Sequence, residues 1–323
     1  MTATLRIAVL DDYQGVALSM ADWSPVGEDA EVVPFAYHLA GEDEAVRALA
    51  DFDVVCMMRE RMRLTGDVIA RLPRLKLIIF TGPRTDAIDL EAAADRGIPV
   101  CNTASRPGVA PAGELTWALV LACARNLPAE FANAREGRWQ TTVGTELHGK
   151  VLGLLGLGSL GAVVARYGRA FGMEVIAWSQ NLTDARAAEQ GATRVEKDEL
   201  FARSDVLSIH LKLSDRSQGL VGARELSLMK PTAMLINTSR GPIVDEAALL
   251  DALRGRRIAM AGLDVFDTEP LPADHPIRAL DNAVITSHIG YVTGEAYRNF
   301  FGGMVEDIAA WRAGAPIRLY PRP

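Results

Sequence analysis

Cysteine is scarce in this chain, and its spacing excludes two kinds of site. The 323 residues contain three cysteines, Cys56, Cys101 and Cys123. An odd number of widely separated thiols without a CxxC pair does not build a disulfide framework or a zinc site. We therefore expect no metal site, a reducing cytoplasmic compartment, and three thiols that are buried as small apolar side chains.

The sequence also lacks long apolar runs and blocks of like charge. No stretch approaches the roughly 18 uninterrupted apolar residues of a membrane-spanning helix, and the apolar run that ends at Asp11 is too short for a signal peptide. The 34 basic and 41 acidic residues give a net charge of −7, and neither kind is clustered. We therefore expect neither a membrane nor a nucleic acid as a partner.

The most informative stretch begins at Val151 and reads VLGLLGLGSLGAVVARYGRAFG. It predicts a strand, a tight glycine turn and a helix. This pattern is typical of dinucleotide binding, because the glycines permit the turn, let the pyrophosphate approach the main chain, and let the helix pack on the strand. The N–H groups at the start of the helix then face the phosphates. The residues expected to bind there are Gly156, Gly158, Ser159, Leu160 and Gly161.

Short apolar runs alternate with segments of helical periodicity along most of the chain. Strands are predicted at 7–10, 31–35, 54–57, 75–80, 151–155, 174–178, 206–211, 234–237, 261–265 and 283–286. Helices are predicted at 42–50, 65–72, 114–124 and 295–311, the third after a loop that carries Pro99, Pro107 and Pro111. The alternation predicts parallel sheets covered on both faces, and the length exceeds what one core usually supports. We therefore expect an α/β protein with two doubly wound parallel-sheet domains.

Three polar residues follow predicted strands of the second half, where open α/β sheets bind ligands. Arg240 can hold a carboxylate by two parallel hydrogen bonds. His288, if it lies beside the carboxylate of Glu269, can hold a proton near neutral pH and transfer it to a carbonyl oxygen. Each residue also has a purely structural interpretation: a salt bridge at a helix start, a solvated loop charge, and a hydrogen bond at a strand end. Their common position at strand ends favours a shared site.

These motifs resemble the D-isomer-specific 2-hydroxyacid dehydrogenase family. The resemblance covers most of the chain and is densest at 146–150, the glycine turn, 228–231, 236–241, 244–246, 262–266 and 269–270. It implies that Arg240 binds and polarises a 2-oxo acid, that His288 is the general acid/base, and that Glu269 pairs with His288. It also implies that Asp264 contacts the nicotinamide amide. Further residues implied to line the coenzyme cleft are His210, Leu211, Thr238 and Ser239.

The same resemblance implies a domain layout and an activity. A flavodoxin-like substrate domain is expected at 1–102 and 291–323, with a Rossmann coenzyme domain inserted at 103–290. The implied reaction is reversible hydride transfer between NAD(P) and C2 of a D-2-hydroxy acid, catalysed by a homodimer whose contact arm at 134–142 includes Trp139. The alternatives are a formate dehydrogenase, disfavoured because those enzymes pair the histidine with glutamine, and a dinucleotide-sensing scaffold resembling corepressors, disfavoured because extended tails are lacking.

One departure from the family pattern concerns the ribose of the coenzyme. Where the family usually has an acidic residue, this chain has Ser179, Gln180 and Asn181. An acid would bind the 2′-hydroxyl and repel a 2′-phosphate. These neutral side chains do neither strongly, and no arginine stands among them. We therefore expect both NAD and NADP to be used, with a slight lean toward NADP.

Other departures concern the substrate. Arg59 and Arg84 follow predicted strands of the first domain, which favours a substrate with a second anionic or strongly polar group. The alternative is that Arg84 pairs with Asp86 or Glu60 and braces its loop. Tyr291 replaces a glycine that the family has after its histidine. The residues expected to contact the substrate are Arg59, Gly82, Arg84, Arg240 and Tyr291.

Overall fold

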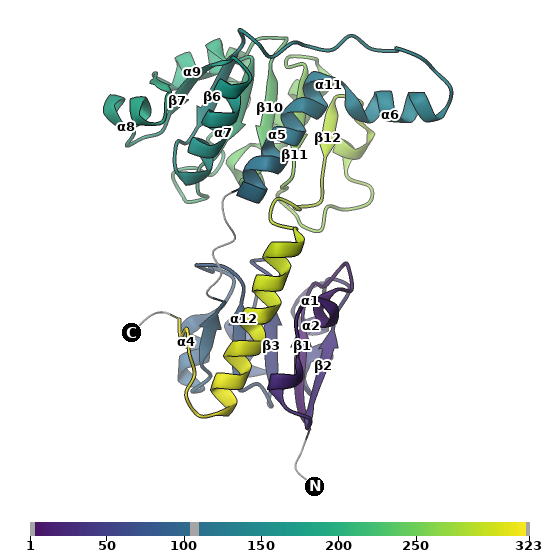
Figure 1. The fold of residues 1–323 in the computed structure, drawn as a ribbon, viewed down its shortest axis with the longest axis vertical. Coiled ribbons are helices and arrows are strands. Elements are labelled where there is room, and N and C mark those ends of the chain that lie inside the picture. Colours follow the sequence, from purple (N-terminus) through teal and green to yellow (C-terminus); the bar gives the residue numbers. More distant parts are fainter. Residues whose placement is uncertain (1–3, 104–109, 321–323) are drawn as a thin grey trace. The chain divides into compact units, whose positions relative to one another are not determined.

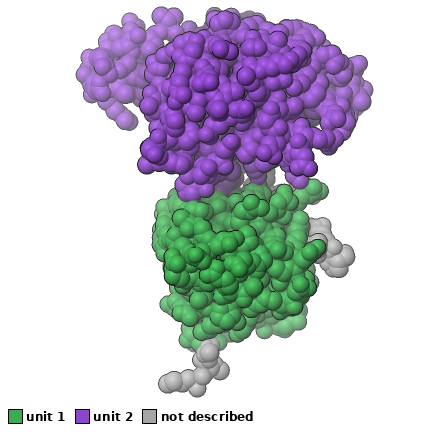
Figure 2. All heavy atoms as spheres, turned by 180° about the vertical axis from the view of Figure 1, so that it is seen from behind, with its two compact units in different colours: residues 1–107, 292–323 green, residues 108–291 purple. Residues whose placement is uncertain are grey.

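A computed structural model describes residues 4–103 and 110–320. The chain forms two compact units, residues 1–107 with 292–323 and residues 108–291 (Figure 2). Each unit contains one sheet, and every strand pair within both sheets is parallel. The predicted fold class, two doubly wound α/β domains, is therefore confirmed.

The first unit is a five-stranded sheet in the order β2-β1-β3-β4-β5, which is the flavodoxin-like order. Its strands are β1 Leu5–Val9, β2 Ala30–Pro34, β3 Val54–Met57, β4 Leu77–Phe80 and β5 Val100–Asn102. Its helices are α1 Ala17–Met20, η1 Ser24–Val26, α2 Glu42–Leu49, α3 Gly66–Ala70, α4 Leu90–Asp95 and α12 Gly294–Arg312. Every residue of β3 and β4 is buried, as expected for a parallel sheet covered on both faces. The long helix α12 brings the end of the chain back onto this sheet (Figure 1).

The second unit is a seven-stranded sheet in the order β12-β11-β10-β9-β6-β7-β8. Its strands are β6 Val151–Leu155, β7 Glu174–Trp178, β8 Thr193–Arg194, β9 Val206–Ile209, β10 Met234–Asn237, β11 Met260–Leu263 and β12 Ala283–Ile285. Its helices are α5 Ala110–Ala124, α6 Leu127–Arg135, α7 Ser159–Ala170, α8 Asp184–Glu189, α9 Lys197–Arg203, α10 Ala223–Leu228, η2 Gly241–Ile243, α11 Glu246–Arg254 and η3 Pro276–Ala279. The strand order reverses between β6 and β9, and ligands of Rossmann folds bind at this reversal.

The element boundaries differ from the predicted ones in an informative way. The predicted strands at 206–211 and 261–265 end at Ile209 and Leu263, so the polar residues after them lie in loops at the carboxyl edge of the sheet. The short strands β5 and β8 were not predicted. Helix α5 begins before the predicted position and has Pro111 in its first turn, where a missing N–H costs little. Pro107 lies outside the described residues.

All three cysteines are buried and unpaired with one another. Burial raises the pKa of the Cys101 and Cys123 thiols to about 12. In the described part of the chain, no three His, Cys, Asp or Glu side chains are grouped as they would be around a metal ion. Across the same residues, no helix combines the length and apolar character needed to cross a bilayer.

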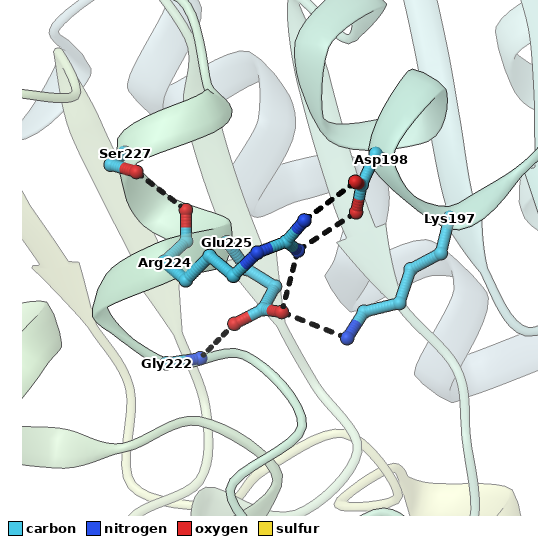
Figure 3. Close-up of polar contacts among 6 residues, drawn as sticks. All are labelled: Lys197, Asp198, Gly222, Arg224, Glu225 and Ser227. Atoms are coloured by element: carbon cyan, nitrogen blue, oxygen red, sulfur yellow. Dashed lines mark hydrogen bonds and ion pairs between the residues drawn. The ribbon is translucent and has the colours of Figure 1, made fainter.

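An ion-pair network joins α9 to α10 on one face of the second sheet (Figure 3). Arg224 donates to both carboxylate oxygens of Asp198, at 2.9 and 2.6 Å. Nζ of Lys197 lies 2.9 Å from Oε1 of Glu225, whose Oε2 accepts the N–H of Gly222 at 3.1 Å. Burial by itself raises the pKa of Glu225, but Lys197 and the main-chain donors outweigh it and hold this pKa below its usual range. The network therefore anchors the start of α10.

Candidate active site

The glycine turn has the geometry that a pyrophosphate requires. Gly156 has φ +104°, and a Cβ there would lie 2.8 Å from the carbonyl carbon and oxygen of His210. Around Gly158, by contrast, a Cβ would meet no atom within 4 Å. Gly158 also precedes the first residue of α7 without any side-chain cap. The N–H groups at the start of α7 are therefore open to a bound anion.

A cavity of about 250 Å³ lies beside this turn. Six of the residues that the sequence predicts for coenzyme binding line this cavity: Gly156, Gly158, Ser179, Asn181, His210 and Leu211. Four residues that were not predicted also line it: Leu157, Leu182, Arg186 and Lys212. Gln180 is directed elsewhere, since its Oε1 accepts a hydrogen bond from Nη1 of Arg216 at 3.3 Å. The glycine turn and the segment after β7 thus line one cavity.

His210 contributes a neutral imidazole to this surface. Its Nε2 lies 2.9 Å from Oγ of Ser208. Desolvation lowers the pKa of His210 to about 3, so the ring is uncharged at neutral pH. Its Nδ1 is buried and has no hydrogen-bond partner among the described residues. Buried polar atoms are seldom left unpaired, so this nitrogen is suited to a contact with a bound coenzyme.

Thr238, just after β10, is oriented by a buried hydroxyl on α5. Oγ1 of Thr116 donates to the carbonyl oxygen of Ala112 at 2.7 Å and lies 2.7 Å from Oγ1 of Thr238. A threonine hydroxyl has a single proton, so Thr238 must be the donor in the pair. The free lone pairs of Thr238 are therefore left to accept a hydrogen bond. Thr116 was not predicted from the sequence, because it lies 122 residues away from Thr238.

Asn237 shapes the turn that carries Arg240. Its Nδ2 donates to the carbonyl oxygen of Arg240 at 2.9 Å, and its Oδ1 accepts the N–H of Ser239 at 3.0 Å. The hydroxyl of Ser239 donates to the carbonyl oxygen of Leu211, which ties β10 to the loop after β9. Nη1 of Arg240 donates to the carbonyl oxygen of Ser239 at 2.7 Å. The main chain around Arg240 is therefore held on both sides.

His288 and Glu269 form a direct pair. Nδ1 of His288 lies 2.5 Å from Oε2 of Glu269, and Oε1 of Glu269 accepts the N–H of Phe266 at 2.9 Å. Burial by itself raises the pKa of Glu269, but the hydrogen bond and charge of His288 outweigh it and lower this pKa. The ring of Tyr291 packs edge-on against the imidazole, with ring centroids 5.8 Å apart. The pair thus combines an ionised carboxylate with an oriented imidazole.

Asp264 organises the loop that carries His288. Its carboxylate accepts hydrogen bonds from the Thr286 hydroxyl at 2.6 Å, the Ile289 N–H at 2.8 Å and the Gly290 N–H at 2.9 Å. Its residue exposure is 1%, and burial raises the pKa of the carboxyl group. His288 has φ +54°, an uncommon conformation for a residue other than glycine. The three bonds to Asp264 flank this residue and hold its backbone.

The substrate residues predicted in the first unit lie at the carboxyl edge of its sheet. The N–H of Arg59 donates to Oγ1 of Thr81 at 2.8 Å, and a Cβ on Gly82 would lie 3.1 Å from Cζ of Arg59. Gly82, with φ +107°, is therefore needed where the guanidinium group passes. Arg84 is exposed, and in the described chain it has no ion pair with Asp86.

Arg61, two residues after Arg59, already has partners in the first unit. Nη1 of Arg61 donates to the carbonyl oxygen of Asp11 at 2.9 Å, and its guanidinium carbon lies 4.9 Å from the ring centroid of Tyr13. Oδ1 of the same Asp11 lies 3.2 Å from Nδ1 of His38, and this hydrogen bond raises the pKa of His38. Arg61 is thus part of a polar cluster at the ends of β1 and β3.

Comparisons with known proteins agree with this geometry. The family described as "D-isomer specific 2-hydroxyacid dehydrogenase, NAD binding domain" matches residues 117–290. A glyoxylate reductase of Aeropyrum pernix is 40% identical over 263 residues, which are 78% of this chain and 78% of that protein. A hydroxypyruvate reductase of Thermotoga maritima is 37% identical over 83% of this chain and 87% of its own length.

Longer relatives and solved structures belong to the same group. A D-3-phosphoglycerate dehydrogenase of Mycobacterium tuberculosis is 37% identical over 84% of this chain, but the match spans only 51% of that protein. The crystal structure of a phosphoglycerate oxidoreductase from Vibrio cholerae superposes with a TM-score of 0.89 at 33% identity, covering 96% of this chain and 100% of that one. The chain therefore belongs to the D-isomer-specific 2-hydroxyacid dehydrogenase family and is an oxidoreductase with that family's NAD-binding domain.

Proposed function

We propose that this protein reversibly reduces a 2-oxo acid to the D-2-hydroxy acid, using NADP as well as NAD, with His288 as the general acid/base. The observation that carries the proposal is the 2.5 Å contact between Nδ1 of His288 and Oε2 of Glu269. When bound, the nicotinamide supplies or accepts the hydride. The residues of the chain bind the acid, move the proton and keep water from the reaction.

The pair determines which nitrogen moves the proton. Because Nδ1 of His288 faces an acceptor carboxylate, this nitrogen carries a proton in both charge states of the ring. Nε2 is then the atom that gives a proton to the carbonyl oxygen in reduction and receives it in oxidation. Glu269 faces the imidazole with an ionised carboxylate, which suits a ring that transfers a proton during the reduction of an oxo acid. A formate dehydrogenase would transfer no proton, so an ionised carboxylate at this position speaks against that alternative.

Arg240 is proposed to bind the carboxylate and polarise the carbonyl group, since its guanidinium group offers parallel donors. Arg59 and Arg84, with Gly82 between them, are proposed to bind a second anionic or strongly polar group of the substrate. The exposure of Arg84, together with the lack of an ion pair to Asp86 within the described residues, supports this role over that of a loop brace. Tyr291 is proposed as a wall beside His288.

The coenzyme residues are proposed to act in three groups. The N–H groups of Ser159 and Leu160, at the start of α7, bind the pyrophosphate. The segment after β7 contacts the adenosine ribose. Asp264, Thr238 and the loop after β9 line the nicotinamide end, where Thr238 is left as an acceptor for an amide N–H.

We also propose a homodimer through the coenzyme domain. Helix α6 contains no buried residue, and the helix and the segment after it together expose three large apolar side chains. Phe131 is 59% exposed, Trp139 84% and Val143 95%. Exposed apolar groups gathered on a projecting segment are typical of an interaction surface. This arm, shown in Figure 1 as α6 and the long connection to β6, is the proposed dimer contact.

The proposed function is tested by following the absorbance of the reduced coenzyme with a panel of 2-oxo acids and both NADH and NADPH. For the best substrate, His288→Ala is expected to lower kcat by roughly 10²- to 10⁴-fold, the usual contribution of a positioned acid/base. His148→Ala, which removes an exposed histidine, is the matched control. Turnover of no 2-oxo acid, or full activity of His288→Ala, would remove the proposal.

A further inference from the structure

We infer that Arg186, supported by Lys212, forms a phosphate subsite that reads the 2′-phosphate of NADP. The inference rests on the proposed coenzyme site. Neither residue is among the ribose contacts that the sequence predicts. The 250 Å³ cavity beside the glycine turn has a positively charged lining. Arg186 and Lys212 are the charged side chains in its lining, and no acidic residue lines it within the described chain.

The position of Arg186 matches the ribose end of the coenzyme. In Rossmann folds the adenosine ribose lies at the end of the second strand, and an acid there selects NAD. Here that strand is β7, and the cavity wall after it consists of Ser179, Asn181 and Leu182 followed by Arg186. A cation therefore stands on the wall where an NAD-specific enzyme has a carboxylate.

Local structure explains why Arg186 lies beside the cavity. Oγ1 of Thr183 accepts the N–H of Arg186 at 3.3 Å and caps α8. This cap starts the helix immediately after Leu182, whose side chain is buried. The chain therefore turns back beside the end of β7 instead of continuing away from it. Inspection of positions 179–181 alone finds no arginine, because the guanidinium group comes from the following helix.

Two neighbouring arginines are engaged by other partners. Arg194 pairs with Glu196 at 2.9 Å, and Arg216 donates to Gln180 at 3.3 Å. Neither Arg186 nor Lys212 forms an ion pair with a carboxylate of the described residues. An unpaired guanidinium group at a cavity wall can bind phosphate oxygens through two parallel hydrogen bonds. Arg216, held to the same segment by Gln180, adds further positive charge.

The test uses the whole protein and two ligands that differ only in the 2′-phosphate. Isothermal titration calorimetry measures the Kd of adenosine 5′-monophosphate and of adenosine 2′,5′-bisphosphate. The wild type is expected to bind the bisphosphate at least about tenfold more tightly, the scale of a charged hydrogen bond. Arg186→Ala is expected to remove most of this preference while leaving the Kd of the monophosphate unchanged, and Lys212→Ala to remove a smaller part.

Three variants complete the design. Arg166→Ala removes an exposed arginine of α7 that does not line the cavity, and it is expected to keep the wild-type preference. Arg186→Lys is expected to keep part of the preference for the bisphosphate, because lysine retains the positive charge but cannot form two parallel hydrogen bonds. Ser179→Asp is expected to shift the preference toward the monophosphate through repulsion of the 2′-phosphate.

The outcomes separate this inference from the proposed function. Equal affinity of the wild type for the two ligands, or an equal loss for both in Arg186→Ala, would overturn the phosphate subsite. If the protein still oxidises NADH with a 2-oxo acid in that case, the dehydrogenase proposal stands. If it binds neither ligand and turns over neither coenzyme, the proposed function fails and the subsite fails with it.

Discussion

Nδ1 of His288 lies 2.5 Å from Oε2 of Glu269, although the two residues are 19 positions apart in the chain. The carboxylate is fixed from its other side by the N–H of Phe266. The imidazole therefore cannot rotate its Nδ1 away without removing this contact from Oε2 of a partly buried carboxylate. This relationship fixes the orientation of the ring and leaves Nε2 as the nitrogen that can face a substrate.

Glu269→Gln is expected to lower the pH at which the rate of oxo acid reduction falls. His288 lowers the pKa of Glu269, so the pair depends on a carboxylate charge that glutamine lacks. We expect the loss of that charge to move the fall in the reduction rate by about 1 pH unit or more. The measurement is the pH profile of kcat/KM for reduction. An unchanged profile would remove Glu269 from the mechanism, and activity below that of His288→Ala would contradict its supporting role.

Asp264→Asn is expected to lower both kcat and the melting temperature. Asparagine keeps the shape of the side chain but turns one acceptor into a donor that faces Thr286 or a main-chain N–H, at a cost of about 1–3 kcal/mol. Thr286→Val removes only one of the three hydrogen bonds and should have a smaller effect. Thermal unfolding and coenzyme titration distinguish two roles. A weaker coenzyme Kd with an unchanged melting temperature would show that Asp264 contacts the coenzyme without holding the loop.

Arg84→Ala is expected to raise the KM for the best substrate by about tenfold or more, as expected for the loss of one charged hydrogen bond. The coenzyme Kd and the melting temperature should change little, because the side chain is exposed. Arg63→Ala, another exposed arginine of the first unit, is the matched control. A melting temperature lowered by several degrees with unchanged kinetics would identify Arg84 as a structural residue, and substrate selection would then lie with Arg59 and Tyr291.

Trp139→Glu is expected to convert a dimer into a monomer. The side chain is 84% exposed, and a carboxylate at the proposed contact would have to be buried without a partner. Sedimentation velocity over a range of concentrations measures the change. Leu18→Glu, at an apolar side chain of the first unit that is 54% exposed, should leave the mass unaltered. A wild-type protein that sediments as a monomer would contradict the proposed dimer.

Local patterns in the sequence determine the fold class and the loops that carry the proposed catalytic residues. The strands at 54–57, 151–155, 174–178 and 234–237 have the predicted bounds, because apolar runs of strand length are confined by turn residues on both sides. The glycine turn is equally local, since its backbone angles depend on three residues of one short segment. Arg240 and His288 could be found for the same reason, because strand ends can be read from the sequence.

The tertiary structure alone decides which side chains meet. The hydroxyl of Thr116 reaches Thr238 across 122 residues, and no periodicity reports such a pair. Asp264 joins a loop 22 to 26 residues further along the chain. Arg186 lines the cavity beside the glycine turn because the cap at Thr183 fixes where α8 begins. The periodicity of a strand depends on neighbours along the chain, whereas these contacts depend on how separate elements pack. The sequence by itself therefore does not predict which residues line the cavity.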